Sequence, residues 1–327
     1  GLDHVKELAA AGIMGTLTVL VFNILFLVII PRGLDGYFIA IILGQLIPAV
    51  FLIWKNKVPY SRIKDRRLEW EMVGYSAPLI LTTLSWWINS VSDRYVITYM
   101  CGLDNNGIYS ISSKIPSIII VVQQIFIQAW QISAFKEKDL NSKGAFHNHV
   151  LKYLSMMMVI LCSILISIAQ ILAHVLYAKD FYIAWIYTPF LLISAILNSF
   201  SGLLGPLMSV KNKNIDIAKS SLVGAFVNMG LNIVLIFFIG VQGAAVATAV
   251  SSLLIYLMRW YVIRDIIEYN VHKKIVLSVL ILCMQAALKI YVPGNSIMVL
   301  CGFLIVTVFY RELYDLMKNL REKYLGR

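Results

Sequence analysis

Residues 106–135 read NGIYSISSKIPSIIIVVQQIFIQAWQISAF, a stretch long enough to cross a bilayer as a single helix. Its polar side chains recur at three- and four-residue steps, or multiples of them, and so share one helix face: Lys114, Ser117, Gln124, Gln128 and Gln131. Such a face is not offered to lipid tails, so it must line a water-filled cavity or contact another helix. An ionisable residue at this depth indicates a functional site.

The rest of the chain is of the same kind. The 327 residues are 60% hydrophobic and 14% charged, whereas a soluble domain carries about 25% charged residues. Apolar runs near the bilayer-spanning length of about 20 residues recur throughout, and strand-type alternation is absent. The sequence therefore predicts an all-α polytopic membrane protein. We expect about ten spans, at 6–30, 36–54, 72–101, 106–135, 148–176, 182–210, 215–239, 243–264, 274–292 and 296–316.

The net charge of +11 does not indicate a nucleic-acid partner, because of where the charges lie. Lysine and arginine gather in alternate loops, which is the pattern of cytoplasmic loops in membrane proteins. These basic segments are 55–67, 136–143, 211–213, 264–274 and 318–327. The pattern predicts that both ends of this chain lie in the cytoplasm and that the number of spans is even.

Small residues at matching spacings indicate an internal repeat. The two sets are Gly33, Gly36 and Ala40, and Gly240, Gly243 and Ala247. Six expected spans separate them, so both copies have one orientation, as in transporters built from parallel repeats. The alternative is that small residues simply often begin membrane helices.

The repeat predicts how the chain is organised. Residues 1–54 would be the last two helices of a first six-helix bundle, 55–71 a basic cytoplasmic linker, 72–265 a second six-helix bundle, and 266–327 two appended helices with a basic tail. About four helices of the first bundle would then precede residue 1.

Charged residues inside the third and fourth spans are candidates for function. Folding these spans back on each other places Asp93 and Lys114 at similar distances from the turn, which predicts a salt bridge between them. Arg94 then lacks a carboxylate partner, and a free guanidinium suits phosphate oxygens. The alternative is that these charged side chains reach the outer membrane interface and have a structural role.

Polar and aromatic neighbours of Arg94 complete the candidate cavity. Tryptophan with adjacent polar groups can stack on sugar rings, although it also marks membrane interfaces. The candidate substrate-binding residues are Arg94, Lys114, Asp93, Trp87, Asn89, Ser90, Gln124, Gln128 and Gln131. Prolines within four expected spans predict bends there: Pro78, Pro116, Pro189 and Pro206.

Motifs for enzymatic chemistry are missing from the sequence. No Walker loop, dinucleotide fingerprint, zinc-protease motif or nucleophile elbow occurs, and the four cysteines stand singly. We therefore expect no ATP hydrolysis, catalytic residues, metal site or cofactor. A coupling ion, H⁺ or Na⁺, is an open expectation.

Four segments resemble the Wzx-type polysaccharide repeat-unit flippases of the multidrug/oligosaccharidyl-lipid/polysaccharide exporter superfamily. They read SWWINSVSDRYVITYMCG at 85–102, NGIYSISSKIP at 106–116, QAWQISA at 128–134 and GVQGAAVAT at 240–248. The resemblance implies two six-helix bundles and translocation of undecaprenyl-diphosphate-linked oligosaccharide across the bacterial inner membrane, for O-antigen- or capsule-type polysaccharides. It also implies that Arg94 and Lys114 meet the diphosphate or acidic sugars. Partners would be the lipid-linked oligosaccharide, membrane lipids, a polysaccharide polymerase and a chain-length regulator.

Two other functions stay open. A multidrug/cation antiporter of the same fold would need an acidic cavity, whereas Arg94 and Lys114 favour anions. An integral membrane glycosyltransferase or polymerase would usually need a large outer loop or carboxylates, and the expected outer loops are only a few residues long.

Overall fold

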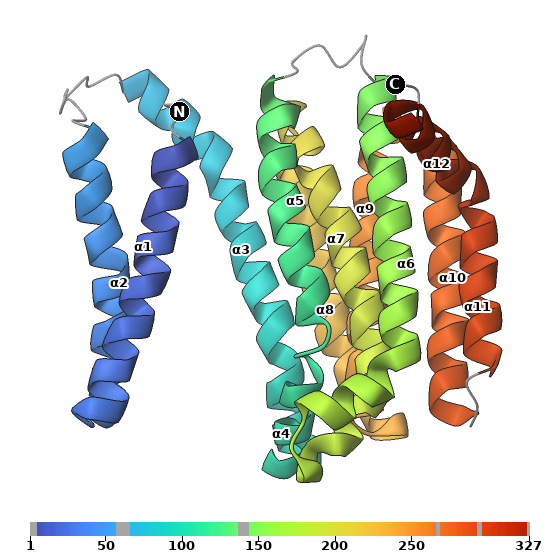
Figure 1. Ribbon diagram of the computed structural model, residues 1–327, viewed down its shortest axis with the longest axis horizontal. Helices are drawn as coiled ribbons and strands as arrows, with labels where there is room; N and C mark the ends of the chain where they lie inside the picture. Colours follow the sequence, from blue (N-terminus) through green and yellow to red (C-terminus); the bar gives the residue numbers. More distant parts are fainter. Residues whose placement is uncertain (1–4, 57–65, 137–143, 266–268, 293–295, 326–327) are drawn as a thin grey trace. The chain divides into compact units, whose positions relative to one another are not determined.

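A computed structural model describes residues 5–56, 66–136, 144–265, 269–292 and 296–325. The chain forms two compact units, residues 1–66 and 67–327. The first unit contains α1 (Val5–Asn23), the π-helix η1 (Ile24–Ile29) and α2 (Gly33–Asn56). The second contains α3 (Arg66–Cys101), α4 (Leu103–Ser112), α5 (Ser117–Lys136), α6 (Gly144–Leu176), the 3₁₀ helix η2 (Lys179–Ile186), α7 (Thr188–Val210), α8 (Asn214–Ile239), α9 (Gln242–Val262), α10 (Tyr269–Tyr291), α11 (Ser296–Val308) and α12 (Tyr310–Leu325) (Figure 1).

The predicted all-α polytopic membrane fold is confirmed. Within the described residues, seven helices are long and apolar enough to cross a bilayer, and the bent pair α4–α5 makes an eighth. The other two expected spans correspond to α3, which has 36 residues but many polar ones, and α11, which has 13. The assignment of these helices to two six-helix bundles stays a prediction.

The fourth expected span is not one helix. α4 and α5 meet at 47°, and residues 113–116 separate them. Pro116 has no N–H to donate to the Ser112 carbonyl, which an uninterrupted helix would require. The buried Thr188 hydroxyl of α7 lies 3.4 Å from that carbonyl oxygen and donates to it instead. The predicted bend at Pro116 is therefore a complete break in the helix.

Two further expected spans are divided in the structure. In the stretch 182–210, α7 begins only at Thr188, with Pro189 in its first turn, where a missing N–H costs nothing. In the stretch 296–316, α11 ends at Val308, and the charged helix α12 follows after one residue. Figure 1 shows α12 lying across the ends of α6 and α10 rather than continuing α11.

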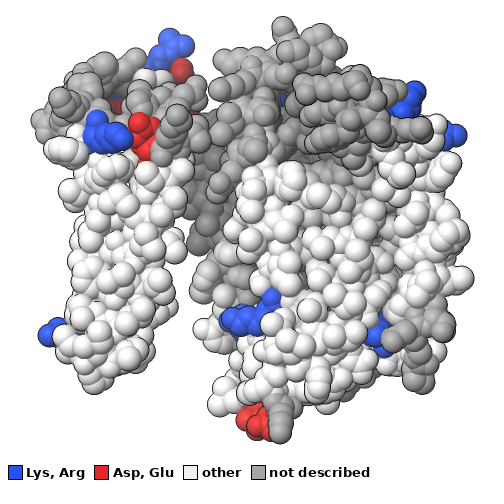
Figure 2. Space-filling view, viewed as in Figure 1, with Lys and Arg blue, Asp and Glu red and all other residues white. Residues whose placement is uncertain are grey.

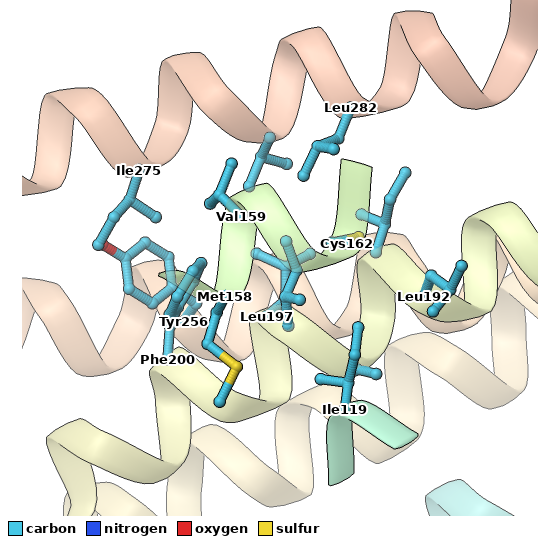
Figure 3. Close-up of a cluster of buried hydrophobic side chains, with 14 of the residues drawn as sticks. Ile119, Met158, Val159, Cys162, Leu192, Leu197, Phe200, Tyr256, Ile275 and Leu282 are labelled. Atoms are coloured by element: carbon cyan, nitrogen blue, oxygen red, sulfur yellow. The ribbon is translucent and has the colours of Figure 1, made fainter. Parts of the chain in front are cut away.

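α7 is the central helix of the second unit and packs against α5, α6, α9 and α10. Its apolar side chains form the middle of one continuous core, part of which Figure 3 shows. Core residues labelled there include Ile119 of α5, Val159 of α6, Leu197 and Phe200 of α7, Tyr256 of α9 and Leu282 of α10. The helices beyond α9 are thus joined to the bundle through α6 and α7.

Charged side chains lie mainly at the helix ends. On the face shown in Figure 2, the described lysine, arginine and carboxylate side chains leave an uncharged belt between the two ends of the second unit. The chain order and Figure 1 place the start of α3, the α7–α8 turn, the end of α9 and α12 at the same end of this unit. We call this the basic end, because the described lysines and arginines at 66–67, 211–213 and 264 all lie there.

The two glycine-marked hairpins share local structure. Gly33 (φ +58°) and Gly240 (φ +61°) both adopt the left-handed conformation that favours glycine. A Cβ atom on Gly36 would lie 2.7 Å from Phe26 Cβ, and one on Gly243 would lie 2.3 Å from the Leu235 carbonyl carbon. Ala40 and Ala247 are both fully buried. Both hairpins therefore have a glycine of positive φ at the turn and a glycine where the helices approach closely, and the internal repeat itself stays a prediction.

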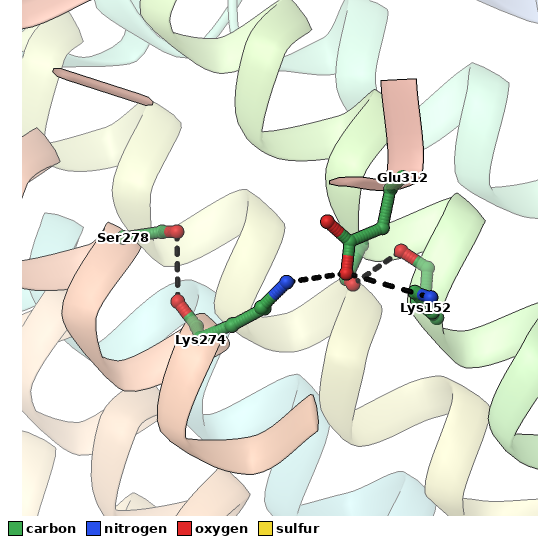
Figure 4. A network of polar contacts seen from close by, with 5 residues as sticks. Lys152, Lys274, Ser278 and Glu312 are labelled. Carbon is green, nitrogen blue, oxygen red and sulfur yellow. Dashed lines mark hydrogen bonds and ion pairs between the residues drawn. The ribbon is translucent and has the colours of Figure 1, made fainter. Parts of the chain in front are cut away.

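A buried carboxylate attaches α12 to the basic end. Glu312 is 1% exposed and accepts a hydrogen bond from Lys274 Nζ of α10, while Lys152 Nζ of α6 lies 3.7 Å away (Figure 4). Burial alone would raise the pKa of Glu312, but the Lys274 hydrogen bond and the two lysine charges outweigh it, so the pKa lies below its ordinary value. Folding therefore favours the ionised form.

We expect Glu312→Gln to lower the free energy of unfolding by about 1.5–3 kcal/mol at neutral pH, the contribution of a hydrogen bond to a charged group. In the wild type this stabilisation is complete above the ordinary glutamate pKa and is lost as the pH falls through the lowered folded-state value. Melting temperatures measured from pH 7 to pH 3 should converge between variant and wild type at the acidic end. Glu71→Gln, at an exposed pair with Arg67, is the control, and a constant difference between Glu312→Gln and wild type at all pH values would contradict the assignment.

Candidate functional site

Asp93 is a buried carboxylate within the helices of the second unit. Most of α3 is exposed, and its buried side chains are Ser85, Asp93 and Ile97. Asp93 is 5% exposed and reaches between α8, α9 and α4. An ionised carboxylate at membrane depth is costly unless polar groups surround it, so its partners define what this place can do.

Four neutral side chains donate hydrogen bonds to Asp93. On Oδ1, Asn228 Nδ2 lies at 2.8 Å and Asn232 Nδ2 at 2.6 Å, both from α8. On Oδ2, Thr248 Oγ1 of α9 lies at 2.7 Å and Tyr109 Oη of α4 at 3.0 Å. Four donors suit an ionised carboxylate, which only accepts hydrogen bonds. The set satisfies the carboxylate's hydrogen-bonding capacity without neutralising its charge.

The predicted salt bridge between Asp93 and Lys114 is wrong. Neither Asp93 nor Lys114 forms an ion pair with any described residue, and Lys114 is exposed in the turn between α4 and α5. The prediction measured distance along two straight helices, whereas the break at Pro116 ends α4 early. Asp93 is instead held by neutral donors from helices more than 130 residues further along the chain, and by Tyr109.

Several oxygens around Asp93 are buried without a hydrogen-bond donor. Among the described residues, these include Oδ1 of Asn89, Asn228 and Asn232. Amide nitrogen and oxygen positions are interchangeable assignments, so either asparagine of α8 could turn an oxygen towards the carboxylate if a cation bound there. Together with Thr248 Oγ1, these oxygens form a donor set that suits a hard cation. One carboxylate fits a monovalent ion, and no cluster of three metal-binding side chains of the His, Cys, Asp and Glu types occurs in the described part.

Other predicted site residues lie on a different side of α3. Arg94, Trp87 and Ser90 are exposed and follow one helix face about a quarter turn from Asp93. Trp87 is 56% exposed, and Ser90 Oγ donates to the Trp87 carbonyl at 2.9 Å. Asn89 lies on the buried side with Asp93, and its carbonyl oxygen lies 3.4 Å from Asn228 Nδ2. The predicted α3 residues therefore fall into two groups. Asp93 and Asn89 lie on the buried side of the helix, and Arg94, Trp87 and Ser90 lie on an exposed face.

The described part of the polar face of α5 also points away from the bundle core. Ser117 and Gln124 are exposed, while Ile119 and Trp130 on the opposite side pack against α7 or hydrogen-bond to it. Lys114 precedes this helix, so it is adjacent to the polar face but not on the same continuous helix. Gln128 and Gln131 are in α5, with side chains outside the described part of the structure. We call Arg94, Trp87, Ser90, Lys114, Ser117 and Gln124 the exposed polar set.

Solved structures of two membrane proteins share this arrangement of helices. One is titled "Lipid II flippase MurJ, inward closed conformation" (TM-score 0.60, 16% identity, covering 94% of this chain) and the other "Crystal structure of MATE in the straight conformation" (TM-score 0.63, 14% identity, covering 79% of this chain). At these identities the likeness shows that this chain shares the fold of the two solved structures. This chain spans 67% and 62% of the lengths of those two solved chains. No protein-family profile and no curated protein sequence matches it.

The partners of Asp93 were not predicted from the sequence. Asn228 and Asn232 are four residues apart in an otherwise apolar stretch of α8, so they share one helix face. Both are fully buried. Two amides on one face of a membrane helix were a signal that another polar group must face them.

A buried arginine was also not predicted from the sequence. Arg259, in the last turn of α9, is 8% exposed. Its guanidinium donates to Ser220 Oγ at 3.1 Å, Ser221 Oγ at 2.9 Å and the Ser201 carbonyl oxygen at 2.8 Å. These bonds join α9 to α8 and α7. Like Asp93, Arg259 is surrounded by neutral groups and has no ion pair with a described residue.

Proposed function

We propose that this protein moves undecaprenyl-diphosphate-linked oligosaccharide repeat units across the bacterial inner membrane. The observation that carries the proposal is the exposed polar set, with two cations that make no ion pair with a described residue. Guanidinium and ammonium groups recognise diphosphate oxygens, and Trp87 offers an aromatic surface for sugar rings. A solved neighbour with the same fold is titled a lipid II flippase, which supports a lipid-linked substrate.

The chemistry suggests how such a substrate would move. The charged diphosphate and the sugars would follow the exposed polar residues of α3 and α5, while the prenyl chain stays among lipid tails. The protein supplies no bond-breaking step in this proposal and acts by alternating access. The basic end would face the cytoplasm by the positive-inside rule. A polymerase and a chain-length regulator are the expected partners that use the delivered repeat unit.

A monovalent cation or a proton at Asp93 would couple this movement to an ion gradient. The buried carboxylate, its four neutral donors and the unpartnered amide oxygens of α8 support this role. The same cluster favours a second candidate function, a multidrug/cation antiporter. We rank it lower because the exposed residues Arg94 and Lys114 would repel a cationic cargo.

Complementation tests the proposed substrate. A bacterial strain lacking its repeat-unit flippase would receive the gene or its Arg94→Ala and Lys114→Ala variants, with membrane levels matched. We expect wild type to restore surface polysaccharide and each variant to reduce it about tenfold or more, because each loses a charge-assisted contact worth about 1.5–3 kcal/mol.

Lys219→Ala, which removes an exposed lysine of α8, is the matched control and should behave as wild type. If the Arg94→Ala and Lys114→Ala variants both restore polysaccharide fully, the site assignment fails. If wild type fails with several glycans but exports a cationic dye, the antiporter is the better description.

A further inference from the structure

A pocket at the basic end lies apart from the exposed polar set and from Asp93. It has a volume of about 440 Å³ and opens between the α7–α8 turn and the end of α9. Its lining consists of Lys211, Lys213, Asp216, Tyr261, Val262, Arg264 and Asp265. We call it the turn pocket. Its walls are the ends of three helices that can each cross a bilayer, so it lies at the depth of the lipid headgroups.

The α7–α8 turn holds its two lysines in a fixed geometry. Asn212 has φ +57°, Lys213 N donates to the Met208 carbonyl at 2.8 Å, and Asn212 N donates to the Ser209 carbonyl at 3.0 Å. This is the hydrogen-bond pattern of a Schellman motif, with asparagine in the left-handed position that glycine usually takes. The backbone carrying Lys211 and Lys213 is therefore fixed before any ligand arrives.

The charges of the turn pocket are only partly compensated. Lys211 Nζ forms an ion pair with Asp265, and this hydrogen bond lowers the pKa of Asp265 below its ordinary value. Arg264 lies over the Tyr261 ring, 4.4 Å from its centroid, so its N–H groups stay available at the edge. Lys213 and Arg264 form no ion pair with a described carboxylate. Asp216 is the second carboxylate of the lining. Three cations and two carboxylates therefore give the pocket one net positive charge.

One net positive charge at headgroup depth matches a singly charged phosphodiester. A phosphomonoester would bring a second negative charge against Asp216. Val262 and the Tyr261 ring offer apolar surface beside the cations, where the glycerol and first acyl carbons of a lipid would lie. A free phosphate ion would leave that surface uncovered.

We propose that the turn pocket binds the phosphodiester headgroup of a membrane phospholipid, with Lys213 and Arg264 as the phosphate ligands. Arg264 supplies planar paired donors and Lys213 a mobile single charge. Asp265 keeps Lys211 away from the lipid and sets the net charge of the pocket. This site is independent of the proposed flippase activity, because none of its residues belongs to the exposed polar set.

Lipid retention by the purified protein tests this proposal. Native mass spectrometry would count phosphatidylglycerol bound after a titration in detergent, with phosphatidylcholine as the comparison lipid. We expect the double variant Lys213→Gln/Arg264→Gln to bind phosphatidylglycerol about 30-fold more weakly, about fivefold for each cation removed near an anionic headgroup. Asp265→Asn should bind it more tightly, because Lys211 is then released.

Two comparisons separate this site from the alternatives. Lys219→Gln removes a cation of α8 outside the pocket and should bind phosphatidylglycerol as wild type does. Unchanged binding in the double variant would overturn the site. Displacement of phosphatidylglycerol by inorganic phosphate at equal concentration would show a soluble-anion site and would overturn the lipid assignment.

Discussion

Asp93→Asn is expected to abolish ion-coupled transport while the protein still inserts and folds. Asparagine has nearly the same shape, and the Thr248 and Tyr109 hydroxyls can turn to accept from its amide. The negative charge is gone, so a cation loses its only ionised ligand in the cluster. Loss of such a charge-assisted contact costs about 1.5–3 kcal/mol or more at low dielectric, which predicts at least tenfold to hundredfold lower activity.

The measurement is surface polysaccharide in the complemented strain, together with the sodium and pH dependence of substrate movement in proteoliposomes. Asp104→Asn, at an exposed aspartate of α4, is the matched control and should leave both readouts unchanged. An Asp93→Asn protein that moves substrate at the wild-type rate, with the wild-type ion dependence, would show that Asp93 is purely structural. Its effect also differs from that of Arg94→Ala, which should weaken substrate handling without changing the ion dependence.

Gly243→Ala is expected to be the most destabilising single-methyl change in the α8–α9 hairpin. The added Cβ would lie 2.3 Å from the carbonyl carbon of Leu235, 2.4 Å from its oxygen and 2.6 Å from Ile236 N. All three are backbone atoms, so no side-chain rotation can relieve the overlap, and α8 and α9 must separate. We expect the free energy of unfolding to fall by more than the usual cost of overpacking, about 1–3 kcal/mol. The measurement is a lower melting temperature and less protein in the membrane.

Gly230→Ala provides the control for this effect within α8. A Cβ there would meet nothing within 4 Å, so the change should be neutral or slightly stabilising through helix propensity. Because Asn228, Asn232 and Thr248 lie on the same two helices, separation of the hairpin should also disrupt the Asp93 cluster. Equal melting temperatures for the two glycine variants would contradict the close approach at Gly243.

The fold class could be predicted from the sequence because membrane helices are recognisable by their length and apolar composition. Interruptions were harder to foresee. Pro116 indicated a bend, but whether a proline bends or breaks a helix depends on which side chain donates to the freed carbonyl oxygen, and Thr188, the donor here, lies 72 residues away from Pro116 along the chain. The start of α7 at Pro189 and the separation of α12 from α11 likewise depend on packing that local patterns do not encode.

Of the buried cluster around Asp93, the sequence predicted the carboxylate itself but not the side chains that surround it. Asp93 stood out because a buried carboxylate in a membrane span needs a reason, but its partners are set by tertiary structure. Asn228, Asn232 and Thr248 lie 135 to 155 residues away from it along the chain. The search for an opposite charge led to Lys114, whereas neutral amides and hydroxyls can surround a carboxylate equally well. Arg259 is likewise a buried charge that neutral groups surround, and here the charge is positive.

The way α3 is fastened has a mechanical consequence. Ser85, Asp93 and Ile97 are the buried side chains of this 36-residue helix, and Asp93 accepts three of its four side-chain hydrogen bonds from α8 and α9. Arg259 joins α7, α8 and α9 by hydrogen bonds, whereas α3 is attached to the bundle by fewer contacts, of which the Asp93 hydrogen bonds are the most numerous. If the Asp93 cluster is also the cation site, cation binding and the position of α3 are linked equilibria. Each then changes the other by the same free energy. An ion gradient acting on Asp93 would then shift the position of α3.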